Sequence, residues 1–161
     1  MSVIISRLIK SGDLKDGAVT RPKLGASPAE IFDSGDVSCA VGTGGTASRT
    51  TLYSLPTNYY CLIPLAIYME VGGTVATGET IDISVKILLD DDTELEVASY
   101  SITGGTGSST ETTPIANLLA SLRSGGLTKD GNRITSIVAD VSSSATSTSA
   151  TATVRVVGIR L

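Results

Sequence analysis

Regular alternation of apolar and polar residues in segment 81–89 constrains the fold more than any other feature of the sequence. The apolar positions are Ile81, Ile83, Val85, Ile87 and Leu89. Because side chains in a β-strand point alternately to opposite faces, all of them lie on one face of an extended segment. Such a strand needs a second layer over its apolar face, so the segment predicts a sheet with one packed and one solvated face.

Similar segments follow one another along the chain and are separated by short loops rich in Gly, Ser and Thr. Besides 81–89, we expect strands at 36–41, 49–55, 59–71, 93–103, 133–141 and 150–161. The loops between them include 44–46, 72–74, 104–106 and 142–149. Glycine pairs permit the positive φ angles of tight turns. Seven to eight strands punctuated in this way predict an all-β chain, an antiparallel β-sandwich of the single jelly-roll type.

Two of the expected strands change phase along their length. In 93–103 the apolar positions shift from Leu95 and Val97 to Ala98, Tyr100 and Ile102. In 150–161 they shift from Val154 and Val156 to Val157, Ile159 and Leu161. A shift of one residue moves the following side chains to the opposite face. Each segment therefore predicts a β-bulge or a strand that crosses between two sheets.

One short helix is expected in a connection between strands. Thr113-Pro114 provides an N-cap followed by a first-turn proline, and Ser124-Gly125-Gly126 ends the helix. The apolar residues at helical spacing are Ile115, Leu118, Leu119 and Leu122. We interpret them as core residues of a helix that caps one open end of the sandwich.

The first 34 residues differ from the rest because they show no sustained strand or helix period. We interpret residues 1–34 as an extended N-terminal arm and residues 35–161 as the sandwich domain. In water the apolar residues of the arm would form an unfavourable exposed patch, so we expect them to contact an adjacent subunit, for example as an added strand. The predicted interface residues are Val3, Ile4, Ile5, Leu8, Ile9, Val19, Pro22 and Leu24.

The composition excludes most catalytic classes. The sequence contains no histidine, which removes Ser-His-Asp and Cys-His catalysis, histidine-bound metals and the usual pH switch near neutrality. Neither G-x-S-x-G, nor S-x-x-K, nor a phosphate-binding G-x-x-x-x-G-K-[ST] motif occurs. Segment 42–47 matches a loose dinucleotide pattern but precedes an expected strand rather than a helix. We therefore expect no enzyme activity and no cofactor.

Other polar features have simpler structural interpretations. Asp90, Asp91 and Asp92 are expected to form a solvated acidic turn, because their spacing is not that of a calcium-binding loop. Cys39 and Cys61 both lie in expected strands, and one disulfide and two buried free thiols stay open as alternatives. Five Tyr and one Phe, with no Trp, offer few rings for stacking on a sugar.

The charge balance argues against general nucleic-acid binding. Twelve Lys and Arg residues against 16 Asp and Glu give a formal net charge of −4, which does not attract a phosphate backbone. The thin basic cluster comprises Arg7, Lys10, Lys15, Arg21 and Lys23. We interpret it as solvated or in contact with a partner. No apolar run has the length of a membrane span, and no signal peptide is expected.

A short element of the arm resembles a motif of viral fibre proteins. Asp16-Gly17-Ala18-Val19-Thr20, followed after two residues by Lys23-Leu24, is similar to the D-G-[AS]-[VI]-T-x-x-K-L element of tail-fibre and head-fibre proteins of bacteriophages and related viruses. In those proteins the element belongs to elongated, usually trimeric, attachment or connecting regions. The resemblance implies a virion component, and the expected sandwich looks like the single jelly roll of viral capsid, spike and turret proteins.

These observations lead to one preferred function and two alternatives. We expect a virion structural protein, such as a capsid, decoration, fibre-base or spike subunit, that self-assembles through its arm as a trimer or pentamer. Its partners would be other copies of itself, other virion proteins and a host-surface receptor. The alternatives are a cell-surface filament or pilus subunit that polymerises by strand donation, and a carbohydrate-binding sandwich module.

Overall fold

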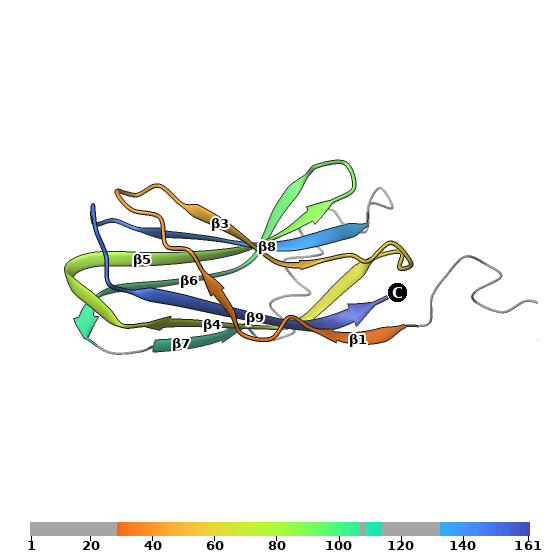
Figure 1. The fold of residues 1–161 in the computed structure, drawn as a ribbon, viewed down its shortest axis with the longest axis horizontal. Helices are drawn as coiled ribbons and strands as arrows, with labels where there is room; N and C mark the ends of the chain where they lie inside the picture. Colours follow the sequence, from red (N-terminus) through yellow and green to blue (C-terminus); the bar gives the residue numbers. More distant parts are fainter. Residues whose placement is uncertain (1–28, 107–108, 114–132) are drawn as a thin grey trace, which may run out of the picture.

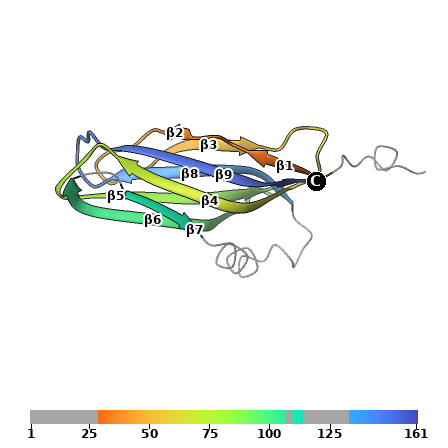
Figure 2. The ribbon, with the colours of Figure 1, turned by 90° about the horizontal axis from the view of Figure 1, so that it is seen from below.

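The fold is a two-layered β-structure in a computed structural model that describes residues 29–106, 109–113 and 133–161. Figure 1 shows the two layers along the long axis of the molecule, and Figure 2 shows them turned by 90°. The strands of the described part are β1 (Glu30–Asp33), β2 (Val37–Cys39), β3 (Ser48–Ser54), β4 (Leu62–Gly72), β5 (Thr74–Leu89), β6 (Glu94–Thr106), β7 (Ser109–Thr113), β8 (Ile134–Ser143) and β9 (Thr151–Arg160).

The strands form two sheets in which every named strand pair is antiparallel. One sheet has the order β1-β9-β4-β7, with β2 also pairing with β9. The other has the order β3-β8-β5-β6. Since β1 and β2 lie one after the other along β9, they fill one strand position, and each sheet has four positions. The described part is therefore an antiparallel sandwich, as the sequence predicts.

The order of pairing identifies the sandwich as a jelly roll. When β1 and β2 are counted as the first of eight positions, the first position pairs with the eighth and the second with the seventh. The third pairs with the sixth and the fourth with the fifth. This nested pairing is that of a long antiparallel ribbon rolled into two facing sheets. The predicted single jelly roll is confirmed.

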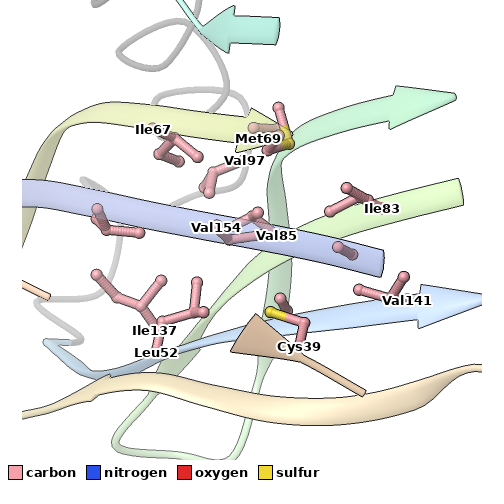
Figure 3. Close-up of a cluster of buried hydrophobic side chains, with 14 of the residues drawn as sticks. Cys39, Leu52, Ile67, Met69, Ile83, Val85, Val97, Ile137, Val141 and Val154 are labelled. Atoms are coloured by element: carbon pink, nitrogen blue, oxygen red, sulfur yellow. The ribbon is translucent and has the colours of Figure 1, made fainter. Parts of the chain in front are cut away.

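The core lies between the two sheets and consists of aliphatic side chains (Figure 3). The alternating apolar residues of β5 all face it, and the most exposed of them, Leu89, is only 5% exposed. The opposite sheet contributes residues such as Ile67, Met69 and Val154, each fully buried. The alternation in the sequence thus predicts correctly which face of β5 is packed.

One of the two predicted phase changes, that in β6, is confirmed, whereas the one predicted for residues 150–161 is wrong. In β6, Val97 and Ala98 are both buried, and the pairing with β5 shifts register between Val85 and Lys86, which is a β-bulge. Strand β9 instead keeps a regular alternation, with Val154 and Val156 buried in the core. The apolar residues of its second half therefore lie on the outer face of the sheet, half-buried.

Strands β1 and β7 are absent from the sequence prediction. From the sequence alone, residues 30–33 are expected to belong to the arm. They instead pair with β9, where Phe32, 3% exposed, fills the core. The proposed arm boundary at residue 34 therefore falls inside the sheet region. Strand β7 consists of Ser, Thr and Glu only, so no apolar pattern marks it. The expected helix at 114–122 lies outside the described residues.

A short break separates β1 from β2. Gly35 has a φ of +66°, a conformation in which glycine lacks the steric cost of other residues. Ser34 keeps the contact with β9, because its backbone N–H donates to the Val156 carbonyl at 2.9 Å and its Oγ accepts from the Val156 N–H at 2.9 Å. The edge of the sheet thus continues past the break.

One carboxylate is buried at the opposite end of the sandwich from the C-terminus. Glu79 is 5% exposed, and its oxygens accept hydrogen bonds from the Ser143 hydroxyl at 2.6 Å and the Ala76 N–H at 2.8 Å. Hydrogen bonds from Ser143, Thr148 and Ala76, in that order of size, lower the pKa of Glu79. This carboxylate joins an irregular part of β5 to the end of β8.

The alternative left open for the cysteines is resolved in favour of free thiols. Cys39 is buried in the core at the end of β2, and Cys61 is half-buried just before β4. Burial raises the pKa of both thiols, which keeps them protonated near neutral pH.

The packing of Phe32 depends on a glycine in β9. The Phe32 ring stacks on the Tyr53 ring with 4.3 Å between centroids and thereby links the two sheets. Phe32 lies opposite Gly158, where an added Cβ would clash with the Ile63 carbonyl oxygen and approach the Phe32 ring carbons to 2.6 and 2.8 Å. Only glycine leaves room for the ring at this position.

We predict that Gly158→Ala destabilises the fold by about 1–3 kcal/mol, because the new methyl group clashes with the Ile63 carbonyl oxygen and with the Phe32 ring that stacks on Tyr53. Urea unfolding followed by circular dichroism measures the change. Gly72→Ala is the matched control, since its Cβ would meet only the Thr151 hydroxyl, which can rotate away. Equal stability changes in the two variants would contradict the proposed role of Gly158.

Candidate subunit interface

The interface residues expected from the sequence, between Val3 and Leu24, lie outside the described residues. The described part does show where the N-terminal segment joins the sandwich. It joins at Glu30, which pairs with Arg160, the last residue of β9. Figures 1 and 2 show that the start of β1 and the C-terminus lie at the same end of the molecule.

A polar clamp formed by Glu30, Arg160 and Tyr59 holds this junction. Arg160 Nη2 and the Tyr59 hydroxyl both donate to Glu30 Oε2, at 2.7 and 2.5 Å. Arg160 also lies 4.5 Å from the centroid of the Tyr59 ring and donates from Nη1 to the Tyr53 hydroxyl at 2.8 Å. Hydrogen bonds from Tyr59 and then Arg160 lower the pKa of Glu30. The clamp fixes the point from which the N-terminal segment leaves the sheet.

Three isoleucines lie next to the clamp, in one row across the outer face of the sheet. Ile31 of β1 pairs with Ile159 of β9, which on its other side pairs with Ile63 of β4. Ile31 is 75% exposed, and the other two are half-buried. Directly paired residues share a face of a sheet, so these side chains form a continuous apolar strip, which we call the isoleucine row.

Further apolar residues extend the isoleucine row along the outer face. Val157 and Ala66 form the next pair, and Tyr68, 42% exposed, follows on β4. Charged groups border this strip: Arg155 donates from Nε to Asp33 Oδ1 at 2.9 Å, and Glu70 is exposed beyond Tyr68. The strip is thus narrow and has a polar rim.

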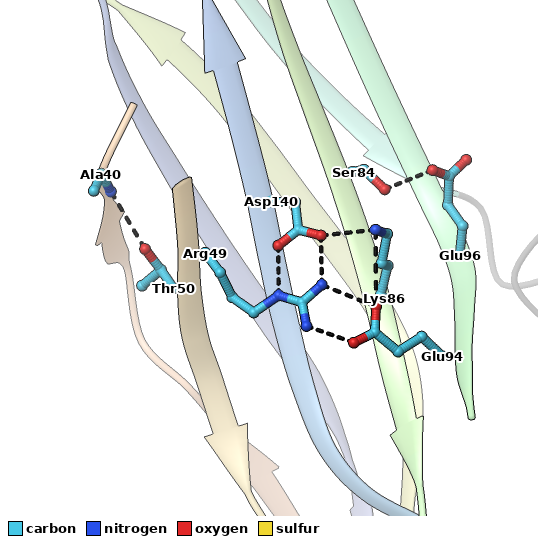
Figure 4. Close-up of polar contacts among 8 residues, drawn as sticks. All are labelled: Ala40, Arg49, Thr50, Ser84, Lys86, Glu94, Glu96 and Asp140. Carbon is cyan, nitrogen blue, oxygen red and sulfur yellow. Dashed lines mark hydrogen bonds and ion pairs between the residues drawn. The ribbon is translucent and has the colours of Figure 1, made fainter. Parts of the chain in front are cut away.

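The outer face of the other sheet is entirely different. A charged ladder of Arg49, Asp140, Lys86 and Glu94 crosses its four strands (Figure 4). Arg49 Nε and Lys86 Nζ both donate to Asp140, each at 2.7 Å, and Arg49 Nη2 donates to Glu94 at 2.9 Å. These groups satisfy one another, so this face is stable in water as it stands.

The difference between the two outer faces points to the isoleucine row as the candidate interaction surface. Exposed apolar surface is costly in water unless a partner covers it, whereas paired charges are not. Sequence reasoning missed Ile31 because the apolar pair Ile31-Phe32 is too short to show a period. The sequence pattern did place Val157 and Ile159 on the opposite face from Val154. This was the signal from which the apolar outer face could have been predicted.

The other motifs noted in the sequence have structural roles. Asp90 begins the expected acidic turn, where the Thr93 carbonyl accepts from the Leu89 N–H at 2.9 Å. Arg133 donates to Asp90 at 3.0 Å and lies 5.3 Å from the Tyr60 ring. Within the described ranges, no group of three potential metal-binding side chains occurs. The glycines of segment 42–47 form a turn that leads into β3.

Comparisons with known proteins give matches to solved structures alone. No protein-family model and no curated protein matches the chain. A structure of the Gx strain of infectious bursal disease virus is 15% identical with a TM-score of 0.40, over 84% of this chain and 33% of that chain. The VP2 subviral particle of infectious bursal disease virus is 13% identical with a TM-score of 0.34, over 83% and 32%. The chain spans about a third of the length of these structures. In the described part no helix has the length and apolarity to cross a membrane.

Because of the charged ladder, the free energy of unfolding should depend on pH. Hydrogen bonds from Arg49, and then those from Lys86, lower the pKa of Asp140 from 3.8 to about 2 against the opposing effect of burial. A carboxylate with a lowered pKa stabilises the fold above pH 4, and this contribution is lost as the pH falls from about 4 to 2.

We therefore predict that Asp140→Asn lowers the free energy of unfolding at pH 7 by on the order of 1 kcal/mol, discounted for solvent screening. The difference from the wild type should shrink as the pH falls from 4 to 2, because the wild-type carboxylate is then protonated. Urea unfolding at several pH values measures it. Glu70→Gln, which removes an exposed carboxylate from the other sheet and leaves the charged ladder intact, is the matched control. A constant deficit of Asp140→Asn across this pH range would contradict the prediction.

Proposed function

We propose that this chain is a structural subunit of a virion and that it self-assembles through its N-terminal segment. The observation that carries the proposal is the isoleucine row, with Ile31 75% exposed, beside the point where that segment joins the sheet. An apolar strip at this position favours a protein whose role is to contact other subunits.

The charge distribution supports assembly through the N-terminal segment. Residues 1–28 contain five Lys and Arg and two Asp and Glu, a net charge of +3. The remaining 133 residues contain seven basic and 14 acidic residues, a net charge of −7. A basic segment and an acidic sandwich attract each other, which favours contact between segment and body.

The viral part of the proposal draws on the fibre-type element at residues 16–24 together with the jelly-roll pairing of the sandwich. A jelly roll whose sequence contains no histidine suits a capsid, decoration, fibre-base or spike subunit. We propose a closed ring of three or five copies, located in the virion, as the assembled form, with other virion proteins as neighbours and a host-surface receptor as a further partner. An open helical assembly would instead favour a surface filament.

We predict that deletion of residues 1–28 converts the assembled protein to single chains, because it removes the apolar segment while leaving Glu30 and its clamp in place. Sedimentation velocity of the full-length and truncated proteins measures the mass. Thermal unfolding of the truncated protein provides the control for folding. A truncated protein that folds and keeps the full-length oligomeric state would contradict assembly through the segment.

A further inference from the structure

We infer that the isoleucine row is the docking surface for the apolar residues Val3, Ile4 and Ile5 of a second copy of this chain. The inference rests on the proposed function and deepens it, because it assigns the acceptor surface for the N-terminal segment. The surface consists of Ile31, Ile159 and Ile63, with Val157 and Tyr68 beside them.

The shape of the surface favours an extended segment over a flat sheet as its occupant. A second sandwich stacked on this face would have to bury the ion pair of Asp33 and Arg155 and the exposed Glu70. Taking charged groups out of water costs more than a narrow apolar strip returns. A single extended segment covers the isoleucine row and leaves the charged rim in water.

The sequence of the N-terminal segment matches this surface in length and chemistry. Val3, Ile4 and Ile5 are three consecutive β-branched residues, which favour extended conformation. Their side chains would then alternate between two faces, so that either Val3 and Ile5 or Ile4 would contact the row. The isoleucine row crosses three strands, and neighbouring strands lie about 4.8 Å apart, so the row is roughly 10 Å long. Three residues in extended conformation have a similar length. The segment and the row are therefore of similar size.

The junction lies directly beside the isoleucine row. Strand β1 begins at Glu30 opposite Arg160, the last residue of β9, and the next residue is Ile31 of the row. Arg160 and Tyr59 hold Glu30 at this position. The 24 residues between Ile5 and Glu30 can span up to about 80 Å when extended, which is enough to reach the row of a second copy.

A complementation experiment with full-length chains tests the inference. The donor variant Ile4→Asp/Ile5→Asp keeps the surface but loses the apolar segment. The acceptor variant Ile31→Asp keeps the segment but places a charge in the row, and Ile31 is exposed enough that folding should be unaffected. Each variant alone should associate about tenfold more weakly or worse. An equimolar mixture should form a complex of one chain of each kind, measured by native mass spectrometry.

The matched control is Thr51→Asp, which places the same charge on an exposed edge-strand position of the other sheet. It should assemble like the wild type. Urea unfolding of all variants confirms that the sandwich is intact in each.

The outcomes separate the inference from the function on which it rests. If the donor variant assembles like the wild type, assembly through the segment is wrong. If the donor variant fails to assemble while Ile31→Asp assembles normally, the function stands and the assigned surface is wrong. If both variants fail and their mixture stays monomeric, the segment does not dock on a second copy. Recovery of the mixed complex supports the inference.

Discussion

The structure depends on β9, whose inner face is apolar and whose outer face is apolar towards its C-terminal end. Val154 and Val156 on the inner face are completely buried and join the two sheets, while Val157 and Ile159 on the outer face are only half-buried. The strand is paired on both sides, with β1 and β2 along one edge and β4 along the other. One strand therefore contributes to the core on one face and to the exposed isoleucine row on the other.

This two-sided strand explains the asymmetry of the molecule. On the outer face of the sheet that contains β8 and β5, the charged ladder is centred on Asp140, and its charged groups pair with one another. The sheet built on β9 turns the isoleucine row outward, next to the clamp that fixes Glu30. A protein with paired charges on one outer face and an apolar strip on the other is suited to assembly in a defined direction. The same contrast favours the structural function proposed above over a free single-chain role.

The sequence predicted the fold well where side chains alternate and poorly where they do not. The alternation in segment 81–89 predicted its packed face, and the phase shift of the apolar positions at Val97 and Ala98 predicted the β-bulge of β6. Strand β1 was missed because four residues of mixed polarity carry no period, and β7 was missed because its five residues are all polar. The candidate site was missed because the isoleucine row comes from three strands distant in sequence, and only strand pairing brings Ile31 beside Ile159.

The central claim is that residues of one copy cover the isoleucine row of another. Cysteines at position 31 and at either position 4 or position 5, in a chain whose half-buried Cys61 is replaced by serine, test it directly through disulfide formation, because residues 4 and 5 of an extended segment lie on opposite faces. Chains with normal and heavy nitrogen are mixed under dissociating conditions, reassembled and oxidised, and mass spectrometry reads the linked peptides. The account predicts disulfides that join a light chain to a heavy chain. Disulfides found only within single chains, or none in assembled protein, would contradict it.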